Sequence, residues 1–407
     1  MRLLTLFVLG AVSSTASIAI AGSDPAPAPA PTSGTDFGPQ VRAMFRVAAC
    51  GGDDAVPDRF SPKQVADHCG ELHAVYRSYK KAWADAAQSF IAELRPRDLT
   101  TTVVYPFGGG DLSSALAVYP DATELTTISL EAAGDVRTID TITKSQFAND
   151  VDDVTLALRR LYQSAYSSTK ALQMASHSHL PGTIMMALAG MAVHDMEPVE
   201  LRYFDIQPDG SIRYLTNDEL TDRAAEYERT KRGQTPPKVV THFWYEQDSA
   251  FANVEIRYRP HGADPSAPLR VYRHIVANLD DKHMSDDDRV LKHLRAKGKV
   301  AVMTKGASFL LWYDDFTQVR DYLLKDIAWM VSDASGIPPS YACPAGYEQV
   351  TYGDFTGPYF VIDPKNTRFE FVKLWKDQPH RELPFRFGYP DNAKHNHLMI
   401  TRPKSAS

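Results

Sequence analysis

Four charged residues and a run of three glycines have the types and spacing that could do chemistry in this chain of 407 residues. Two carboxylates can divide general acid and general base roles, or they can accept hydrogen bonds from ligand hydroxyls. A lysine can hold an anion or stabilise developing negative charge. Glycine backbone can approach a ligand closely because it has no Cβ. The candidate ligand-binding residues are Gly108, Gly109, Gly110, Asp111, Glu131, Lys305 and Asp333.

The elements around the glycine run are expected to position two of these carboxylates. Residues 101–105 (TTVVY) are β-branched and aromatic, which predicts a buried strand. Gly108 to Gly110 then predicts a tight turn, and Asp111 or a serine after it can cap a short helix. A second strand is predicted over 124–130, ending at Glu131. This order is typical of the first half of a Rossmann-like unit, so Asp111 and Glu131 are expected to face one cleft beside parallel strands.

Three interpretations of this turn remain open from the residues alone. It can hold a nucleotide-type cofactor, hold a different small ligand, or serve only as a structural turn. The run differs from the G-x-G-x-x-G pattern, and Pro106 precedes it. Exported enzymes also rarely meet free dinucleotide or S-adenosylmethionine, so no cofactor is expected.

Lys305 and Asp333 lie in the C-terminal third of the chain. A strand is predicted over 299–303, which places Lys305 at a strand-to-helix transition, where it either holds an anion or is simply solvated. Residues 316–331 have the spacing of an amphipathic helix. A helix C-cap with Gly336 in the left-handed conformation then explains Asp333, and the surrounding residues lack the Gly-x-Ser-x-Gly pattern of a nucleophile elbow.

Three blocks of sequence resemble a group of uncharacterised secreted bacterial proteins. The first is YPFGGGD with its short helix, Tyr-Pro-Asp-Ala turn and strand ending SLE. The second is TKGASFLLWYDDFTQVRDYLLKDIAWMVSDASGIP, and the third is LPFRFGY. The resemblance extends from about Val103 to the C-terminus and assigns no activity or residue role. This chain has Phe309 and Trp312 where a Tyr and a His are commoner in the group, and Ala334 where a second Asp is.

The N-terminus has the pattern of a secretory signal. Arg2 precedes an apolar run over 3–12, and Ala19 and Ala21 provide the small residues that signal peptidase requires. We expect residues 1–21 to be the signal peptide, followed by a Pro/Ala-rich linker over 22–40. No later segment has 18 consecutive apolar residues, so the mature chain is expected to lack an integral membrane segment and to be secreted or periplasmic.

An exported chain matures under oxidising conditions, so its cysteines require an account. We expect Cys50 and Cys69 to form a disulfide and Cys343 to be a free, inert thiol. The alternatives are a pairing that includes Cys343, or three reduced cysteines.

Three folded regions are expected after the linker. Residues 41–100 are helical, with a long helix after Cys69. Residues 101–235 form the Rossmann-like region, and residues 236–407 a mixed α+β region. The predicted fold class is therefore α/β: a Rossmann-like strand-turn-helix-strand segment combined with a mixed or antiparallel sheet and flanking helices.

Histidine and aspartate clusters do not predict a metal site. His177 with His179, and His395 with His397, each supply only two ligands, whereas zinc requires three or four. The acidic run 280–288 lacks the central Gly and final Glu of an EF-hand loop.

Composition limits the function classes. The apolar content of 43% suits a globular protein, and a net charge of −6 gives no basic footprint for nucleic acid. No nucleophile, base and orienting group occur together. The sequence therefore favours an exported small-ligand-binding or structural envelope protein. The alternative is an extracytoplasmic hydrolase or transferase with an acidic site at the glycine-rich turn.

Overall fold

A computed structural model describes residues 34–164, 178–232, 249–355, 367–387 and 396–404. The expected signal peptide lies outside the described residues, as do most of the linker, His177 and His395. None of the helices in the described part of the chain is long and apolar enough to cross a membrane.

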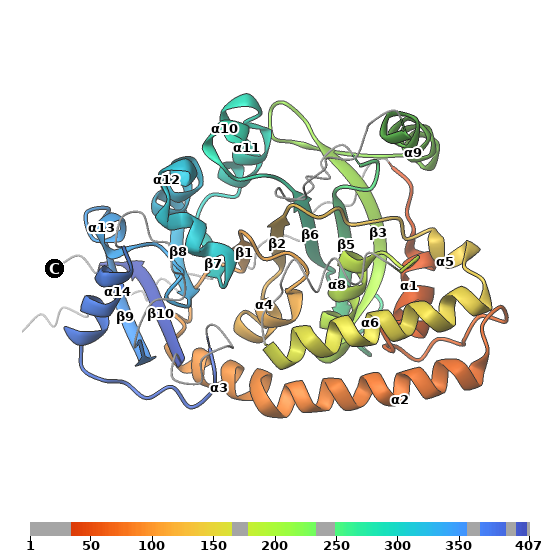
Figure 1. Ribbon diagram of the computed structural model, residues 1–407, viewed down its shortest axis with the longest axis horizontal. Helices are drawn as coiled ribbons and strands as arrows, with labels where there is room; N and C mark the ends of the chain where they lie inside the picture. The colour runs from red at the N-terminus through yellow and green to blue at the C-terminus, as the bar shows by residue number, and fades with distance from the viewer. Residues whose placement is uncertain (1–33, 165–177, 233–248, 356–366, 388–395, 405–407) are drawn as a thin grey trace, which may run out of the picture.

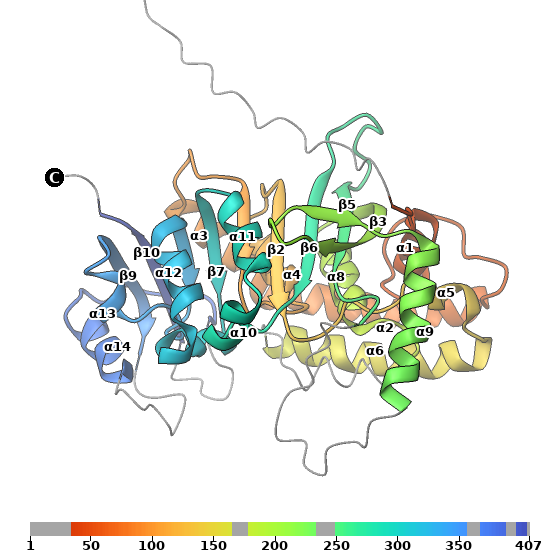
Figure 2. The same cartoon turned by 90° about the horizontal axis from the view of Figure 1, so that it is seen from above.

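One ten-stranded mixed sheet runs through the molecule, in the order β4-β3-β5-β6-β2-β1-β7-β8-β10-β9 (Figures 1 and 2). Strands from the predicted regions 101–235 and 236–407 lie side by side in it. Their bounds are β1 (Thr102–Tyr105), β2 (Glu124–Ser129), β3 (Met196–Ile206), β4 (Ile212–Tyr214), β5 (Val254–Pro260), β6 (Arg270–Val276), β7 (Val300–Thr304), β8 (Ile327–Ser332), β9 (Tyr347–Asp354) and β10 (Asn396–Pro403).

The five central strands, β6-β2-β1-β7-β8, are parallel. Numbered along the chain, these five have the order 3-2-1-4-5 of a doubly wound nucleotide-binding sheet. Antiparallel strands extend both edges: β5, β3 and β4 beyond β6, and β10 and β9 beyond β8. The predicted α/β class with a mixed sheet is confirmed.

Helices cover both faces of this sheet, with α10, α11 and α12 on one side and α2, α3 and α6 on the other (Figure 1). The bounds are α1 (Gly38–Val47), α2 (Pro62–Tyr79), α3 (Asp85–Leu94), α4 (Leu112–Val118), α5 (Thr138–Thr141), α6 (Lys144–Ser164), α8 (Gly182–Val193), α9 (Asn217–Arg232), α10 (Asp281–Asp286), α11 (Arg289–Ala296), α12 (Thr317–Asp326), α13 (Pro339–Ala342) and α14 (Thr367–Lys376).

Alternate residues of β1 belong to two different cores. Val103 and Tyr105 pack with the helices of the α2 side, whereas Val104 packs with those of the α12 side. A strand covered on both faces needs apolar residues at successive positions. The segment TTVVY is therefore a continuous run of β-branched and aromatic residues.

The helix predicted over 316–331 is wrong in its second half. Helix α12 ends at Asp326, and Ile327–Ser332 is the parallel strand β8. Trp329 packs on one face of the sheet and Met330 on the other, so both faces of β8 are buried. Its sequence therefore lacks the alternation of apolar and polar residues that distinguishes a half-buried strand from a helix. The prediction of a helix C-cap at Gly336 is therefore also wrong, because Gly336 does not adopt the left-handed conformation.

The N-terminal helical part is closed by the predicted Cys50–Cys69 disulfide, with its two Cα atoms 5.3 Å apart. Cys343 is exposed and free. His68 lies beside the disulfide, but its Nε2 contacts the Ala48 carbonyl and its Nδ1 the Thr155 hydroxyl. The long helix after Cys69 is confirmed as α2 and α3, joined by a π-helical turn over Lys80–Ala84.

Candidate functional site

The four charged candidates follow the carboxyl ends of four neighbouring parallel strands. Glu131 follows β2, Asp111 follows β1, Lys305 follows β7 and Asp333 follows β8. The chain passes from β1 to β2 on one side and later places β7 on the other side of β1, which makes this edge the topological switch point. Open α/β sheets bind their ligands at this location.

The glycine-rich turn places Asp111 at the start of α4. Gly108 N–H donates to the Tyr105 carbonyl, at 3.1 Å, and Asp111 N–H donates to the Gly108 carbonyl, at 2.9 Å. A Cβ on Gly108 would lie 2.5 Å from the Tyr105 ring, so the close approach of turn and ring requires glycine here. Gly109 has a φ of 50°. The predicted strand-turn-helix-strand segment is confirmed.

Asp111 is buried, and both of its carboxylate oxygens accept hydrogen bonds. Its Oδ1 accepts from the backbone N–H of Ser114 and so caps α4, at 3.3 Å, and its Oδ2 accepts from the Tyr105 hydroxyl, at 3.1 Å. Burial raises the pKa of Asp111, and the Lys305 ammonium opposes that rise. The carboxylate therefore occupies the helix start, where a nucleotide-binding sheet holds a phosphate.

Asp333 joins the loops that follow β7 and β8. Its Oδ1 accepts from the backbone N–H of Ser335, at 2.8 Å, and also from the Ser335 hydroxyl. Its Oδ2 accepts from the Gly306 N–H, at 3.2 Å, and the hydroxyls of Ser335 and Ser308 lie 2.7 Å apart. Burial raises the pKa of Asp333 against these hydrogen bonds.

The Lys305 ammonium lies between these carboxylates and two aromatic rings. Its Nζ is 4.7 Å from the centre of the Trp83 ring and 4.9 Å from that of Phe387, which are cation–π distances. Burial lowers the pKa of Lys305 to about 8, against the attraction of Asp111 and Asp333. Asp111, Lys305 and Asp333 are only 1%, 3% and 0% exposed, so the charged trio is closed to solvent.

Three buried hydroxyl groups lie beside the trio, on Tyr79, Ser114 and Tyr162, and none makes a hydrogen bond of ordinary length and angle with another described residue. Tyr79 interacts with the hydroxyls of Ser113 and Ser114, and Tyr162 with that of Ser113, only through looser contacts. Ser114 lies in the first turn of α4, and the Tyr79 and Tyr162 ring centres are 4.4 Å apart. Burial raises the pKa of Tyr79, and Asp111 raises it further, so the phenol lies within the field of that carboxylate. Buried polar groups without well-formed hydrogen bonds occur at several places in the described residues, and here three of them lie beside charged side chains.

Glu131 is half-buried and lies two residues beyond the end of β2. Its backbone N–H donates to the Ser129 hydroxyl, at 3.3 Å, and its carbonyl accepts from Nε2 of His274, at 2.8 Å. A shared cleft for Asp111 and Glu131 stays a prediction.

Sequence reasoning found the three charged members of this site but missed its aromatic members. Tyr79 ends α2, and Trp83 lies in the π-helical turn that follows it. Phe387 lies in the LPFRFGY block. Spacing four residues apart places Tyr79 and Trp83 on one helix face, but no local signal shows that this face meets the ends of β1 and β7.

No family model, no curated protein and no solved structure matches this chain.

Proposed function

We propose that this is an exported small-ligand-binding protein that holds a neutral, hydroxyl-rich molecule at the carboxyl ends of its parallel strands. The observation that carries the proposal is the group of three buried hydroxyls without well-formed hydrogen bonds, on Tyr79, Ser114 and Tyr162, beside Asp111 and Lys305. A polyol or monosaccharide offers each of them both a donor and an acceptor.

The charges favour a neutral ligand over a phosphate-bearing one. The two carboxylates of Asp111 and Asp333 are balanced by the Lys305 ammonium and the nearby Arg386 guanidinium, and Asp111 already occupies the start of α4. Because the trio is closed to solvent, ligand entry requires these side chains to move apart, and slow association is expected.

Export is supported by the signal-like N-terminus and by the disulfide. Arg2, the apolar run over 3–12 and the Ala19-x-Ala21 pattern support cleavage before Gly22. The Cys50–Cys69 disulfide suits an oxidising compartment such as the periplasm or the extracellular space.

The second candidate, a hydrolase or transferase, is favoured by one observation. An amine with a pKa of about 8, as for Lys305, is partly neutral near physiological pH and can accept a proton, while a carboxyl with a raised pKa, as for Asp111, can donate one. An enzyme of this kind would show turnover whose rate changes near pH 8, whereas a binding protein would return its ligand unchanged.

The test is a thermal-shift panel on the mature chain with myo-inositol, glucose, galactose and ribose, set against inorganic phosphate and NAD. A hydroxylated ligand at about 100 times its Kd should stabilise the folded state by about 2.7 kcal/mol. Asp111→Asn should abolish the shift, and Asp218→Asn, at an exposed position on α9, should keep it. A panel in which only the anions stabilise the chain, or in which nothing does, would overturn the proposal.

A further inference from the structure

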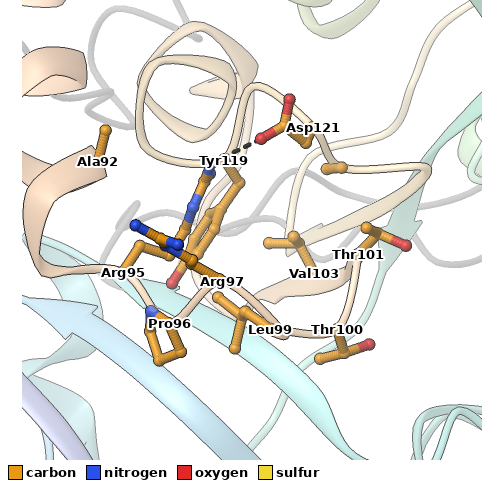
Figure 3. A pocket seen from close by; sticks show the side chains of 11 residues that line it. Ala92, Arg95, Pro96, Arg97, Leu99, Thr100, Thr101, Val103, Tyr119 and Asp121 are labelled. Carbon is orange, nitrogen blue, oxygen red and sulfur yellow. Dashed lines mark hydrogen bonds and ion pairs between the residues drawn. The ribbon is translucent and has the colours of Figure 1, made fainter. Parts of the chain in front are cut away.

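A hollow of about 200 Å³ lies at the opposite, amino end of β1 (Figure 3). It is formed by the end of α3, the loop that leads into β1 and the residues after α4. Asp111, Lys305 and Asp333 contribute nothing to its lining, so any role of this hollow is independent of the function proposed above.

Two arginine side chains reach into this hollow side by side (Figure 3). Arg95 is already engaged: its Nη2 pairs with Asp121, at 2.6 Å, and its Nη1 donates to the Val118 carbonyl, at 3.4 Å. Arg97 is exposed and makes no hydrogen bond or ion pair with any residue that the structure describes. The lining thus holds two guanidinium groups and one carboxylate.

The neutral part of the lining adds a donor and an apolar wall. Thr100 Oγ1 accepts from the Thr102 N–H, at 3.3 Å, which leaves its own proton to donate. Leu99, Val103 and Ala122 are the apolar residues of the lining; Leu99 is half-buried, and Val103 and Ala122 are almost fully buried. Asp98, the acidic neighbour of Arg97 in the chain, does not line the hollow.

We propose that this hollow binds a small organic carboxylate, with its carboxylate on Arg97 and its short hydrocarbon part against Leu99. The guanidinium fork matches the two oxygens of a carboxylate and can form two parallel hydrogen bonds with it. The apolar wall selects an organic acid over inorganic phosphate, which has no carbon chain to bury.

A purely structural role for the arginines is the competing explanation. Both follow the carboxyl end of α3, where a cation interacts favourably with the helix dipole. In that case, replacing Arg97 would change stability, and anions would bind no better to the native protein than to the variant.

The test is calorimetric titration of the full chain with butyrate at low ionic strength, with n-butanol and inorganic phosphate as comparison ligands. Butyrate should bind, and butanol should not. Arg97→Gln should weaken the affinity for butyrate by at least about tenfold. Arg77→Gln, at an exposed position on α2, should leave that affinity unchanged.

Asp121→Asn provides the opposite perturbation. It removes the carboxylate that occupies Arg95, so butyrate should bind more tightly to this variant, an effect that a structural role for Arg97 does not predict. Equal butyrate affinity in native protein and Arg97→Gln would overturn the proposal. Tighter binding of phosphate than of butyrate would overturn its assignment to an organic acid.

Discussion

His274 should make the folded state sensitive to acid, and replacing it with glutamine should remove part of that sensitivity. The imidazole is fully buried on β6, where its Nε2 contacts the Glu131 carbonyl, at 2.8 Å, and its Nδ1 the Thr127 hydroxyl, at 3.3 Å. Burial lowers the pKa of His274 to about 4, against the hydrogen bond to Glu131. The folded protein therefore holds His274 neutral at pH 6.

The magnitude follows from proton linkage. The unfolded chain takes up the proton near pH 6.5 and the folded chain only near pH 4, so the unfolded state carries more protons between these values. Stability attributable to His274 should fall by about 1.4 kcal/mol for each pH unit in this window, and by about 3 kcal/mol in total at pH 4.

The assay is urea unfolding followed by tryptophan fluorescence at a series of pH values between 4 and 7. His274→Gln keeps a donor for the Glu131 carbonyl and does not titrate, so its free energy of unfolding should fall less steeply with acid than that of the native chain. His261→Gln is the opposite control. The hydrogen bond to Glu197, with Asp53 nearby, raises the pKa of His261, so protonation of this residue favours the folded state. Replacing His261 should therefore not make the free energy of unfolding less sensitive to acid. Parallel pH profiles for the native chain and His274→Gln would refute the reasoning.

Two further predictions concern stability. Replacing both Cys50 and Cys69 with serine should lower the free energy of unfolding by about 3 kcal/mol, because the disulfide closes a loop with a sequence separation of 19; an unchanged urea midpoint would contradict this. Glu255→Gln should cost about 3–5 kcal/mol, because the buried Glu255 carboxylate accepts from Arg257, at 2.9 Å, and Arg273, at 2.8 Å. Glu348→Gln, which breaks the exposed pair with Arg402, should cost no more than about 1 kcal/mol, and similar losses for both variants would show that burial does not set the cost.

Local signals in the sequence were sufficient for the first strand-turn-helix-strand segment. A β-branched run, three glycines and a capping acid each have one strong local preference, and together they predict β1, the turn and α4. The Cys50–Cys69 pairing was accessible for a similar reason, since the two cysteines enclose a short loop.

Signals that depend on tertiary context could not be read in the same way. The strand β8 follows α12 without a break and is buried on both faces, so its apolar run matches a helix as well as a strand. That error assigned Asp333 to a helix end and hid its approach to Gly306. Trp83, Asp111, Lys305 and Phe387 meet only because the π-helical turn over Lys80–Ala84, the residues after β1 and β7, and the segment before β10 converge in the fold. No periodicity in the chain encodes that meeting.

The central claim is that the buried hydroxyls beside Asp111 bind a hydroxylated ligand, and the Tyr79→Phe and Tyr162→Phe variants test it most directly. Each variant deletes one buried oxygen that makes no well-formed hydrogen bond in the described chain, so folding stability should stay the same or rise. Calorimetric titration with the panel sugar or polyol that gives the largest thermal shift should show weaker binding to both variants. Tyr76→Phe, which loses a 2.8 Å hydrogen bond to the Ala49 carbonyl, should instead lose about 1 kcal/mol of stability and keep its affinity. Native affinity in both Tyr79→Phe and Tyr162→Phe would contradict the account.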